Sequence, residues 1–261
     1  MLVVLCVYAI VVWLRTPSQE RNWLDDVSQL SEVQWEENNS TFSLQNIRNW
    51  HYSETEVLDK TYFDKSYNLD KLESLWLYVE PIALGEAIAH TFLIFKFKGN
   101  TPQDYLGISI EARLEVGESY SPVAGVLRKL ELHYTWATEQ DLVERRAIHL
   151  HYPLKRYKIQ AKKSHIQGLL RQLLSTTNAL ALTPRWYNTL LDNCTNELLK
   201  SVNEVYANTM PLHYSFVLTG YVDAYLDSLG YIDKSVPMLY ISDIWLKSHM
   251  LRESSEIQMI R

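Results

Sequence analysis

The chain has 261 residues, of which 47% are hydrophobic, and its formal net charge at pH 7 is -6. This length and apolar content suffice for one large domain with a sizeable core, and they exclude a disordered chain. Because the charge is negative and no long basic run occurs, nucleic acid is excluded as the main partner.

The chain begins with an apolar run, residues 1–14, which is followed by Arg15. As a helix this run would span about 21 Å, less than the roughly 30 Å of a bilayer's hydrocarbon core. It also lacks a basic start and an Ala-x-Ala-like cleavage site. We therefore expect residues 1–15 to form a membrane anchor or the end of a longer transmembrane segment. The alternatives are a degenerate signal peptide and a buried helix. Residues 16–22 are polar and typical of a linker.

Runs that alternate or are rich in β-branched and aromatic residues predict strands in the middle of the chain. These predicted strands cover residues 42–47, 91–97, 105–112, 130–136 and 147–152. Turn-forming residues fill the interval 98–104, so the second and third strands are expected to pair as a hairpin.

Helical periodicity predicts helices beside and after these strands, over residues 138–146, 162–174, 194–206 and 216–229. Gly230 is suited to cap the last of them. Because the strands come together and most helices follow them, the pattern indicates an α+β fold rather than alternating βαβ units.

Cys194 stands at the start of the predicted helix 194–206. A thiol in the first helical turn faces unpaired backbone N–H groups, which favour its thiolate. The only other cysteine, Cys6, lies in the apolar N-terminal run, so an intrachain disulfide framework and a Cys-rich zinc site are excluded. From the residues alone, Cys194 is either a reactive thiol or an inert buried cysteine.

A cysteine nucleophile needs a base, and His90 has the most distinctive position of the eight histidines. It directly precedes the apolar strand 91–97, whose backbone would hold the ring near a cleft. The alternative is a structural histidine.

In the expected hairpin, Ser109, Glu111 and Arg113 share one face of the strand next to His90. A carboxylate on a neighbouring strand commonly orients a catalytic imidazole, which makes Glu111 the candidate. The alternative for Glu111 is a structural ion pair with Arg113 or Arg146.

Several motifs occur in the order seen in the Lnb-type N-terminal periplasmic domain family, which the chain resembles over about residues 22 to 235. They are residues 46–52, 89–95, 109–113, 117–120 with Gly125, 139–141, and the run Tyr-Asn-Thr-Leu-Leu-Asp-Asn-Cys-Thr at 187–195. Two positions depart from the family pattern. Gln140 occupies a position where the family has arginine, and Asn196 occupies one where the family has threonine. Neither departure removes the nucleophile or the base.

The resemblance implies a cysteine-hydrolase core in which the histidine precedes the cysteine. This order is similar to the circularly permuted branch of papain-like and NlpC-type enzymes, with a central antiparallel sheet and flanking helices. That branch includes the lecithin-retinol acyltransferases, which share the Asn-Cys motif and carry acyl groups as cysteine thioesters. The Lnb-type family is similarly associated with N-acylation of bacterial lipoproteins from a phospholipid donor.

Residues and resemblance together predict a thiol-dependent acyltransferase anchored in the bacterial inner membrane, with its catalytic domain, residues 16–235, in the periplasm. Residues 236–261 would form a C-terminal extension. Many tyrosines (17) and tryptophans (8) suit a membrane-proximal surface. The expected acceptor is the amine of a lipoprotein's N-terminal lipidated cysteine.

In this scheme Cys194 attacks the phospholipid ester, His90 moves the proton and Glu111 orients His90. Candidates for substrate or oxyanion contacts are Asn193, Thr195, Tyr187, Ser109 and Arg113. No metal or organic cofactor is expected. The alternatives are an extracytoplasmic cysteine peptidase or amidase that acts on the cell wall or an envelope protein, and a non-catalytic binding domain on a hydrolase scaffold.

Overall fold

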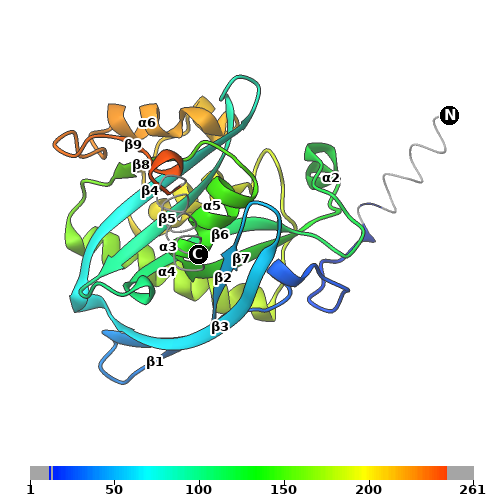
Figure 1. Ribbon diagram of the computed structural model, residues 1–261, viewed down its shortest axis with the longest axis horizontal. Coiled ribbons are helices and arrows are strands. Elements are labelled where there is room, and N and C mark those ends of the chain that lie inside the picture. Colours follow the sequence, from blue (N-terminus) through cyan, green and yellow to red (C-terminus); the bar gives the residue numbers. More distant parts are fainter. Residues whose placement is uncertain (1–11, 13, 246–261) are drawn as a thin grey trace, which may run out of the picture.

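A single large sheet forms the centre of the molecule in the computed structural model, which describes residues 12 and 14–245 (Figure 1). Its nine strands are β1 Glu32–Trp35, β2 Thr41–Tyr52, β3 Val57–Asn68, β4 Leu72–Ala83, β5 Ile88–Phe97, β6 Tyr105–Arg113, β7 Glu131–Thr138, β8 Lys155–Lys158 and β9 Leu239–Tyr240. They are ordered β1-β2-β7-β6-β5-β4-β8-β9, and β3 pairs with β2. Of the named pairings, only that between β2 and β7 is parallel.

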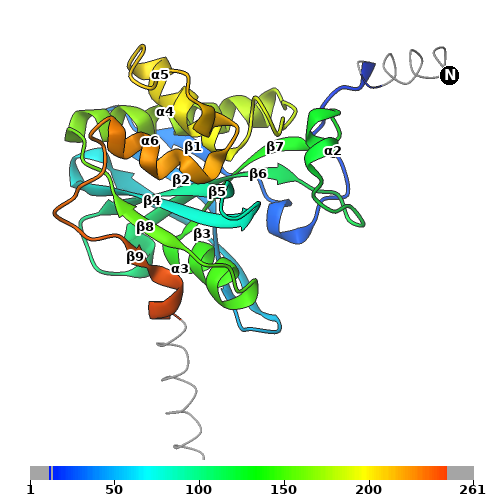
Figure 2. The same ribbon diagram turned by 90° about the horizontal axis from the view of Figure 1, so that it is seen from above.

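Helices cover both faces of this sheet. The α-helices are α2 Pro122–Val126, α3 Glu139–Val143, α4 Lys163–Leu182, α5 Cys194–Val205 and α6 Val222–Ser228. Short 3-10 helices cover Asp25–Val27, Leu69–Lys71, Pro102–Asp104, Tyr214–Phe216 and Thr219–Tyr221, and a π-helix covers Glu144–His149. Figure 2 shows α4, α5 and α6 on one side of the sheet and α3 on the other. The α+β class with a mostly antiparallel sheet is confirmed.

The strand β5 shows why its sequence is a continuous apolar run. Leu93 and Phe95 belong to the core between the sheet and α4 and α5, whereas Phe92 and Ile94 belong to the smaller core on the α3 side. A strand that is buried on both faces has no need for polar residues at alternate positions.

The long helix α4 is amphipathic and buries one stripe against the sheet. Ile166, Leu169, Leu170, Leu173 and Leu174 recur at helical spacing, and all five are buried. This helix extends beyond the predicted 162–174, because its stripe continues on the same face to Leu180.

Four predicted strands correspond to β2, β5, β6 and β7, and the expected hairpin is formed by β5 and β6. The predicted strand 147–152 is wrong, because Glu144–His149 forms the π-helix. Ala147 packs into the smaller core from this helical turn, so the apolar residues of the segment serve helix packing.

The predicted helix 216–229 is interrupted, and only α6 forms its α-helical end. The break lies at Gly220, whose N–H donates to the Ala87 carbonyl at 3.0 Å. A Cβ at Gly220 would lie 1.7 Å from the Glu86 carbonyl oxygen, so this close approach requires glycine. Gly230 has φ +78° and donates to the Asp227 carbonyl, which confirms the predicted cap.

The predicted membrane segment lies almost wholly outside the described residues. Across positions 12 and 14–245, no helix combines the length and apolarity needed to cross a bilayer. Within the predicted extension 236–261, β9 pairs with β8 and Ile241 is buried.

Candidate active site

The candidate site lies where the central sheet opens. The pairing between β5 and β6 begins where Lys96 faces Tyr105 and ends where Phe92 faces Ser109. Both strands continue, however, with β5 paired to β4 and β6 paired to β7. His90 therefore projects from the start of β5, beside the gap between the two central strands.

Cys194 is the first residue of α5 and its side chain is buried. Its thiol and the His90 imidazole lie close enough for each to shift the pKa of the other. The other side of the ring is engaged, because His90 Nε2 lies 2.7 Å from Ser109 Oγ. The nitrogen left for the thiol is therefore Nδ1. The structure thus brings together two residues that are far apart in the sequence.

A short chain of hydrogen bonds supports His90. The Ser109 hydroxyl donates to Glu111 Oε1 at 2.6 Å, and Glu111 Oε1 lies 3.5 Å from His90 Nε2. Because the Ser109 proton points to the carboxylate, its oxygen accepts from His90 Nε2–H. This arrangement leaves Nδ1 free to receive the thiol proton.

Arg146, on the π-helix, fixes the carboxylate end of this chain. Its guanidinium donates to Glu111 Oε1 at 2.8 Å, to Ser109 Oγ at 3.0 Å and to Glu80 Oε2 at 2.8 Å. The Arg146 side chain is almost fully buried, as is that of Glu80. Glu111 therefore makes both of the contacts expected from the sequence. It approaches the His90 ring, as an orienting carboxylate would, and it also forms an ion pair with Arg146.

The charges at the site shift three pKa values. Burial alone would lower the pKa of His90, but Glu111 and Cys194 raise it above its ordinary value. Burial alone would raise the pKa of Cys194, but His90 and hydrogen bonds from His90 and Thr91 lower it. Burial likewise opposes ionisation of Glu111, yet His90 and Arg146 bring its pKa well below the usual range. The pair therefore favours a thiolate beside an imidazolium, which is the reactive form of a cysteine nucleophile.

These shifts predict the pH dependence of thiol reactivity. We expect the alkylation rate of Cys194 by iodoacetamide to rise with pH around a midpoint below the value of about 8.5 for a free cysteine. The rate should change again when the pH passes the raised pKa of His90 and the imidazolium loses its proton. Peptide mass spectrometry of the modified residue measures both transitions. A single transition at the ordinary thiol pKa would contradict the ion pair.

Cys194 and His90 open into a cavity of about 330 Å³. Glu80, Glu111 and Arg146 form part of its polar wall, together with Arg48 and Arg145. Ile82, Ile88, Ile110, Leu114 and Val217 contribute apolar surface. The cavity is thus large enough for part of an organic substrate and has both charged and apolar walls.

Two further candidates line this cavity, Asn193 and Tyr187. Asn193 is the N-cap of α5, and its Oδ1 accepts from Asn196 N–H at 2.9 Å. Its amide donates to the Thr189 and Phe216 carbonyls, both at 3.0 Å, so the side chain holds the loops around Cys194. Burial raises the pKa of Tyr187, with Cys194 adding to the effect, so its phenol remains neutral.

The remaining candidates do not line this cavity. The Ser109 side chain is fully buried between His90 and Glu111. Thr195 directs its hydroxyl to Thr91, with 3.0 Å between the Oγ1 atoms. Arg113 donates to the Val27 and Ser28 carbonyls, both at 2.8 Å, so it braces the N-terminal segment instead.

The two departures from the family pattern also lie away from the cavity lining. The Gln140 amide donates to Glu144 Oε1 at 2.7 Å, and the Asn196 amide donates to the Leu190 carbonyl at 2.8 Å. Both side chains therefore have structural partners in this chain.

The fold and this geometry define an α+β domain in which a buried thiol, a partly buried imidazole and a partly buried carboxylate line one cavity. Residues 59–220, more than half of the chain, match the family described as the Lnb N-terminal periplasmic domain, and the chain belongs to this family. The matched region contains Cys194, His90 and Glu111. Membership supports a periplasmic location for the domain. Searches of curated proteins and of solved structures found no match.

Proposed function

We propose that this domain is a cysteine acyltransferase that moves a fatty acyl group from a phospholipid to the N-terminal amine of a bacterial lipoprotein. The observation that carries the proposal is the Cys194–His90 pair, whose members line one cavity and shift each other's pKa toward the ion pair. This contact favours an enzyme over a binding domain on a degenerate scaffold. Family membership supports the same chemistry.

In the first step, the Cys194 sulfur attacks the carbonyl carbon of the phospholipid ester, and the thiol proton resides on His90 Nδ1. Asn193 Oδ1 and its carbonyl oxygen accept from Asn196 and Glu197 N–H. The N–H groups of Cys194 and Thr195 are the first-turn donors that lack an intrahelical acceptor, and they are suited to stabilise the oxyanion. When the carbon–oxygen bond breaks, His90 gives its proton to the leaving lysophospholipid alcohol, and Cys194 holds the acyl group as a thioester.

In the second step, the lipoprotein amine attacks the thioester carbonyl. His90 Nδ1 accepts a proton from the attacking nitrogen, the carbon–sulfur bond breaks, and Cys194 leaves as a thiolate beside the imidazolium. The products are an N-acyl amide and the starting enzyme. Glu111 and Ser109 hold the His90 ring in one orientation through both steps.

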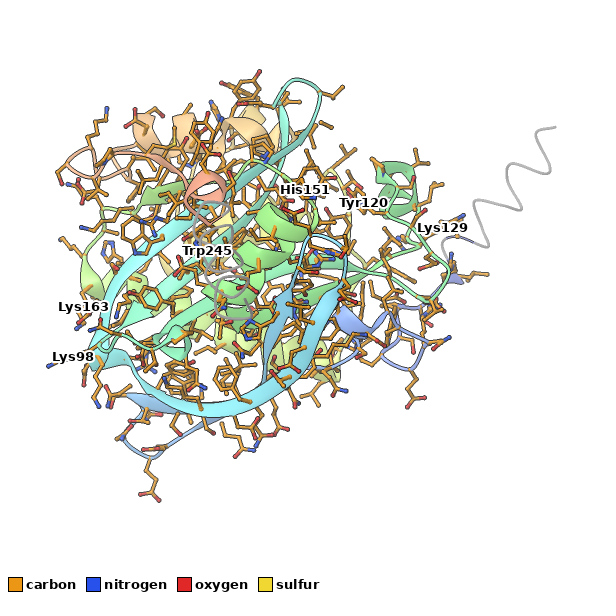
Figure 3. All side chains as sticks on the ribbon, viewed as in Figure 1. Lys98, Tyr120, Lys129, His151, Lys163 and Trp245 are labelled. Carbon is orange, nitrogen blue, oxygen red and sulfur yellow. The ribbon has the colours of Figure 1, made fainter. Side chains whose placement is uncertain are left out.

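Exposed apolar side chains around the cavity support a lipid substrate. Ile82, Tyr120, Tyr152 and Val217 line the cavity and are still 37 to 46% exposed. Tyr120, labelled in Figure 3, precedes α2 on the chain. Leu84, Val123 and Leu191 lie only a few residues from lining positions and are more exposed still. Apolar side chains gathered around a cavity mouth suit contact with a membrane surface.

The proposal includes a circularly permuted papain-like arrangement, because the strand that carries His90 precedes the helix that carries Cys194. It also includes anchoring of the chain in the inner membrane by the apolar residues 1–14. Both substrates are amphiphiles with their reactive groups at the membrane surface, where an anchored enzyme would meet them.

The test is reconstitution of the full chain with phospholipid and a diacylated lipoprotein. We expect mass spectra of the lipoprotein's N-terminal peptide to gain the mass of one fatty acyl group, and intact protein to show a transient acyl adduct on Cys194. An unchanged free amine, together with cleavage of peptidoglycan stem peptides by the same preparation, would refute the proposal. That result would favour the amidase.

Glu111→Gln should reduce the rate of Cys194 acylation roughly 10- to 100-fold, less than removal of the nucleophile, because Ser109 still contacts His90. The lost carboxylate charge should also lower the pKa of His90 and raise the midpoint of Cys194 alkylation toward that of a free thiol. Stopped-flow acylation and the alkylation profile measure the two effects. Glu115→Gln, which alters a carboxylate paired with Arg21, is the control. Parent-like acylation by Glu111→Gln would leave Glu111 with only its structural role.

A further inference from the structure

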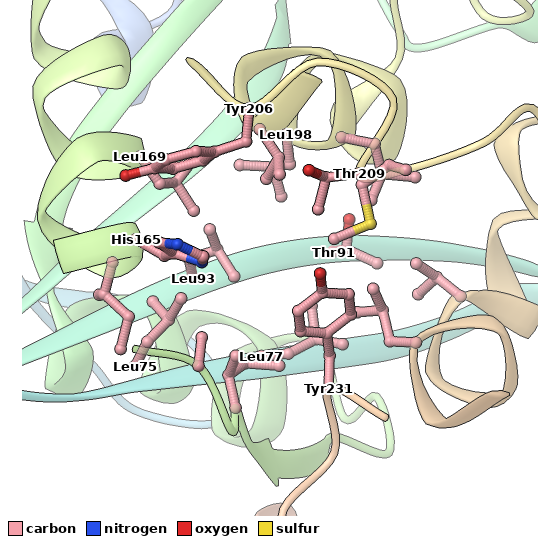
Figure 4. Close-up of a pocket in the computed structure, with 18 of the residues that line it drawn as sticks. Leu75, Leu77, Thr91, Leu93, His165, Leu169, Leu198, Tyr206, Thr209 and Tyr231 are labelled. Carbon is pink, nitrogen blue, oxygen red and sulfur yellow. The ribbon is translucent and has the colours of Figure 1, made fainter. Parts of the chain in front are cut away.

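A second cavity lies on the α4 and α5 side of the sheet and is almost entirely apolar (Figure 4). Leu75, Leu77 and Leu93 line it from the strands, and Leu169 and Leu198 line it from α4 and α5. Its volume is about 80 Å³. At 10 to 15 Å³ per water-sized group, this space holds roughly five to eight such groups in a row or cluster.

This cavity reaches the residues next to the nucleophile. Thr91 and Thr195 line it, and each is the chain neighbour of a residue of the first cavity, His90 or Cys194. The two threonine hydroxyls hydrogen bond to each other at 3.0 Å. The backbone and side chain of Thr91 also help to lower the pKa of the Cys194 thiol. A single layer of side chains therefore separates the sulfur from the apolar space.

We propose that this second cavity binds the alkyl chain of the acyl group carried by Cys194, an inference that rests on the proposed acyltransferase function. The thioester carbonyl would remain at the first cavity, beside the charged wall, and the chain would pass between Thr91 and Thr195 when their side chains part. Both threonine side chains are uncharged, so this passage moves no charged group.

The chemistry of the lining supports an alkyl chain rather than a polar ligand. Among the described residues, neither Asp, Glu, Lys nor Arg lines this cavity, whose titratable side chains are His165, Tyr206 and Tyr231. Protein interiors are close-packed, and an apolar space of this kind stays dry and accepts apolar ligands. The first cavity, in contrast, has Arg48, Arg145 and several carboxylates, which suit the polar part of an amphiphile.

Part of the cavity lining reaches the protein surface. Ala161, Val202, Tyr206 and Tyr231 line it and are only partly buried. A chain longer than the cavity could therefore extend past these residues to the surface. We expect the domain to prefer medium and long acyl chains over short ones without a sharp upper limit.

The test uses p-nitrophenol release during acylation of Cys194, with butyrate and laurate esters as substrates. Val202→Trp should fill the cavity and reduce the rate with laurate tenfold or more, while the rate with butyrate stays within about twofold. Each methylene that loses its apolar site is worth about a fourfold change in rate. Val205→Trp is the matched control, because Val205 lies on the same helix and does not line the cavity. Its ratio of laurate to butyrate rates should equal that of the parent.

A second measurement does not depend on turnover or on a folded variant. A fatty acid analogue with a photoreactive diazirine at the chain end should label the parent protein within the cavity-lining segments around Ala161, Val202 and Tyr231. An unchanged chain-length ratio in folded Val202→Trp, or labelling of the parent only elsewhere, would overturn the inference. Absence of p-nitrophenol release by the parent would refute the proposed function instead, and labelling of the cavity would still identify the chain site.

Discussion

Cys194→Ala is expected to reduce acyl transfer to the lipoprotein amine by at least about a thousandfold, because it removes the atom that forms the thioester. His90 would retain its contacts with Ser109 and Glu111 but would have no thiol to activate. The fold should persist, since alanine fits the first turn of α5 and the Asn193 cap is unchanged. Mass spectra of the lipoprotein N-terminal peptide measure the transfer, and thermal unfolding measures the fold.

The matched control is the chain's other cysteine. Cys6→Ser should transfer acyl groups at the parent rate, which shows that loss of activity is specific to Cys194. Cys194→Ser is a second useful variant, because serine keeps the shape of the site with a far less acidic nucleophile. Transfer by folded Cys194→Ala at a rate close to that of the parent would refute the thioester mechanism.

Arg146→Met is expected to lower the free energy of unfolding by about 3–5 kcal/mol, because it leaves buried carboxylates without their cation. Arg146 bonds both Glu80 and Glu111, and the Glu80 side chain is only 6% exposed. Methionine replaces much of the volume of the arginine stem, so the loss reports mainly on charge. Urea unfolding followed by circular dichroism measures it.

Arg145→Met is the matched control for this variant. Arg145 is the neighbouring residue and pairs with Asp26 at 2.7 Å, but both partners are more exposed. Its removal should cost about 1 kcal/mol or less. Adding Glu80→Gln to Arg146→Met should recover part of the lost stability, since one unpaired charge is removed. A loss below about 1 kcal/mol for Arg146→Met alone would show that the buried pairs do not stabilise the fold.

The central residues of the site could be predicted because each has a local signature. Cys194 follows an N-cap at the start of a periodic helix, and His90 stands at the edge of an apolar strand. Glu111 follows from strand alternation once the hairpin is placed. Glu80 and Thr91 have no comparable signature, because their roles depend on which distant segment packs against them.

Two long strands, β3 and β4, could not be predicted from the sequence, each for a different physical reason. Only one residue of β3 is buried, so its pairing with β2 relies on backbone hydrogen bonds that any sequence can form. In contrast, β4 is buried on both faces around Tyr78, but Glu80 and Pro81 interrupt its apolar run. This segment therefore has neither the alternation of a half-buried strand nor the continuous apolar run by which β5 could be predicted.

The π-helix at Glu144–His149 makes the site sensitive to the length of the chain. A π-turn contains one more residue than the α-helical turn that it replaces. Deleting one residue before Arg146 in this segment would restore α-helical spacing and rotate the side chains on one side of the deletion relative to the other by about 100°. The guanidinium would then point away from Glu80 and Glu111, although no side chain of the site had been altered. The electrostatic environment of His90 thus depends on the number of residues in this turn. An insertion or deletion there would change the charges near His90, as a substitution of Arg146 would.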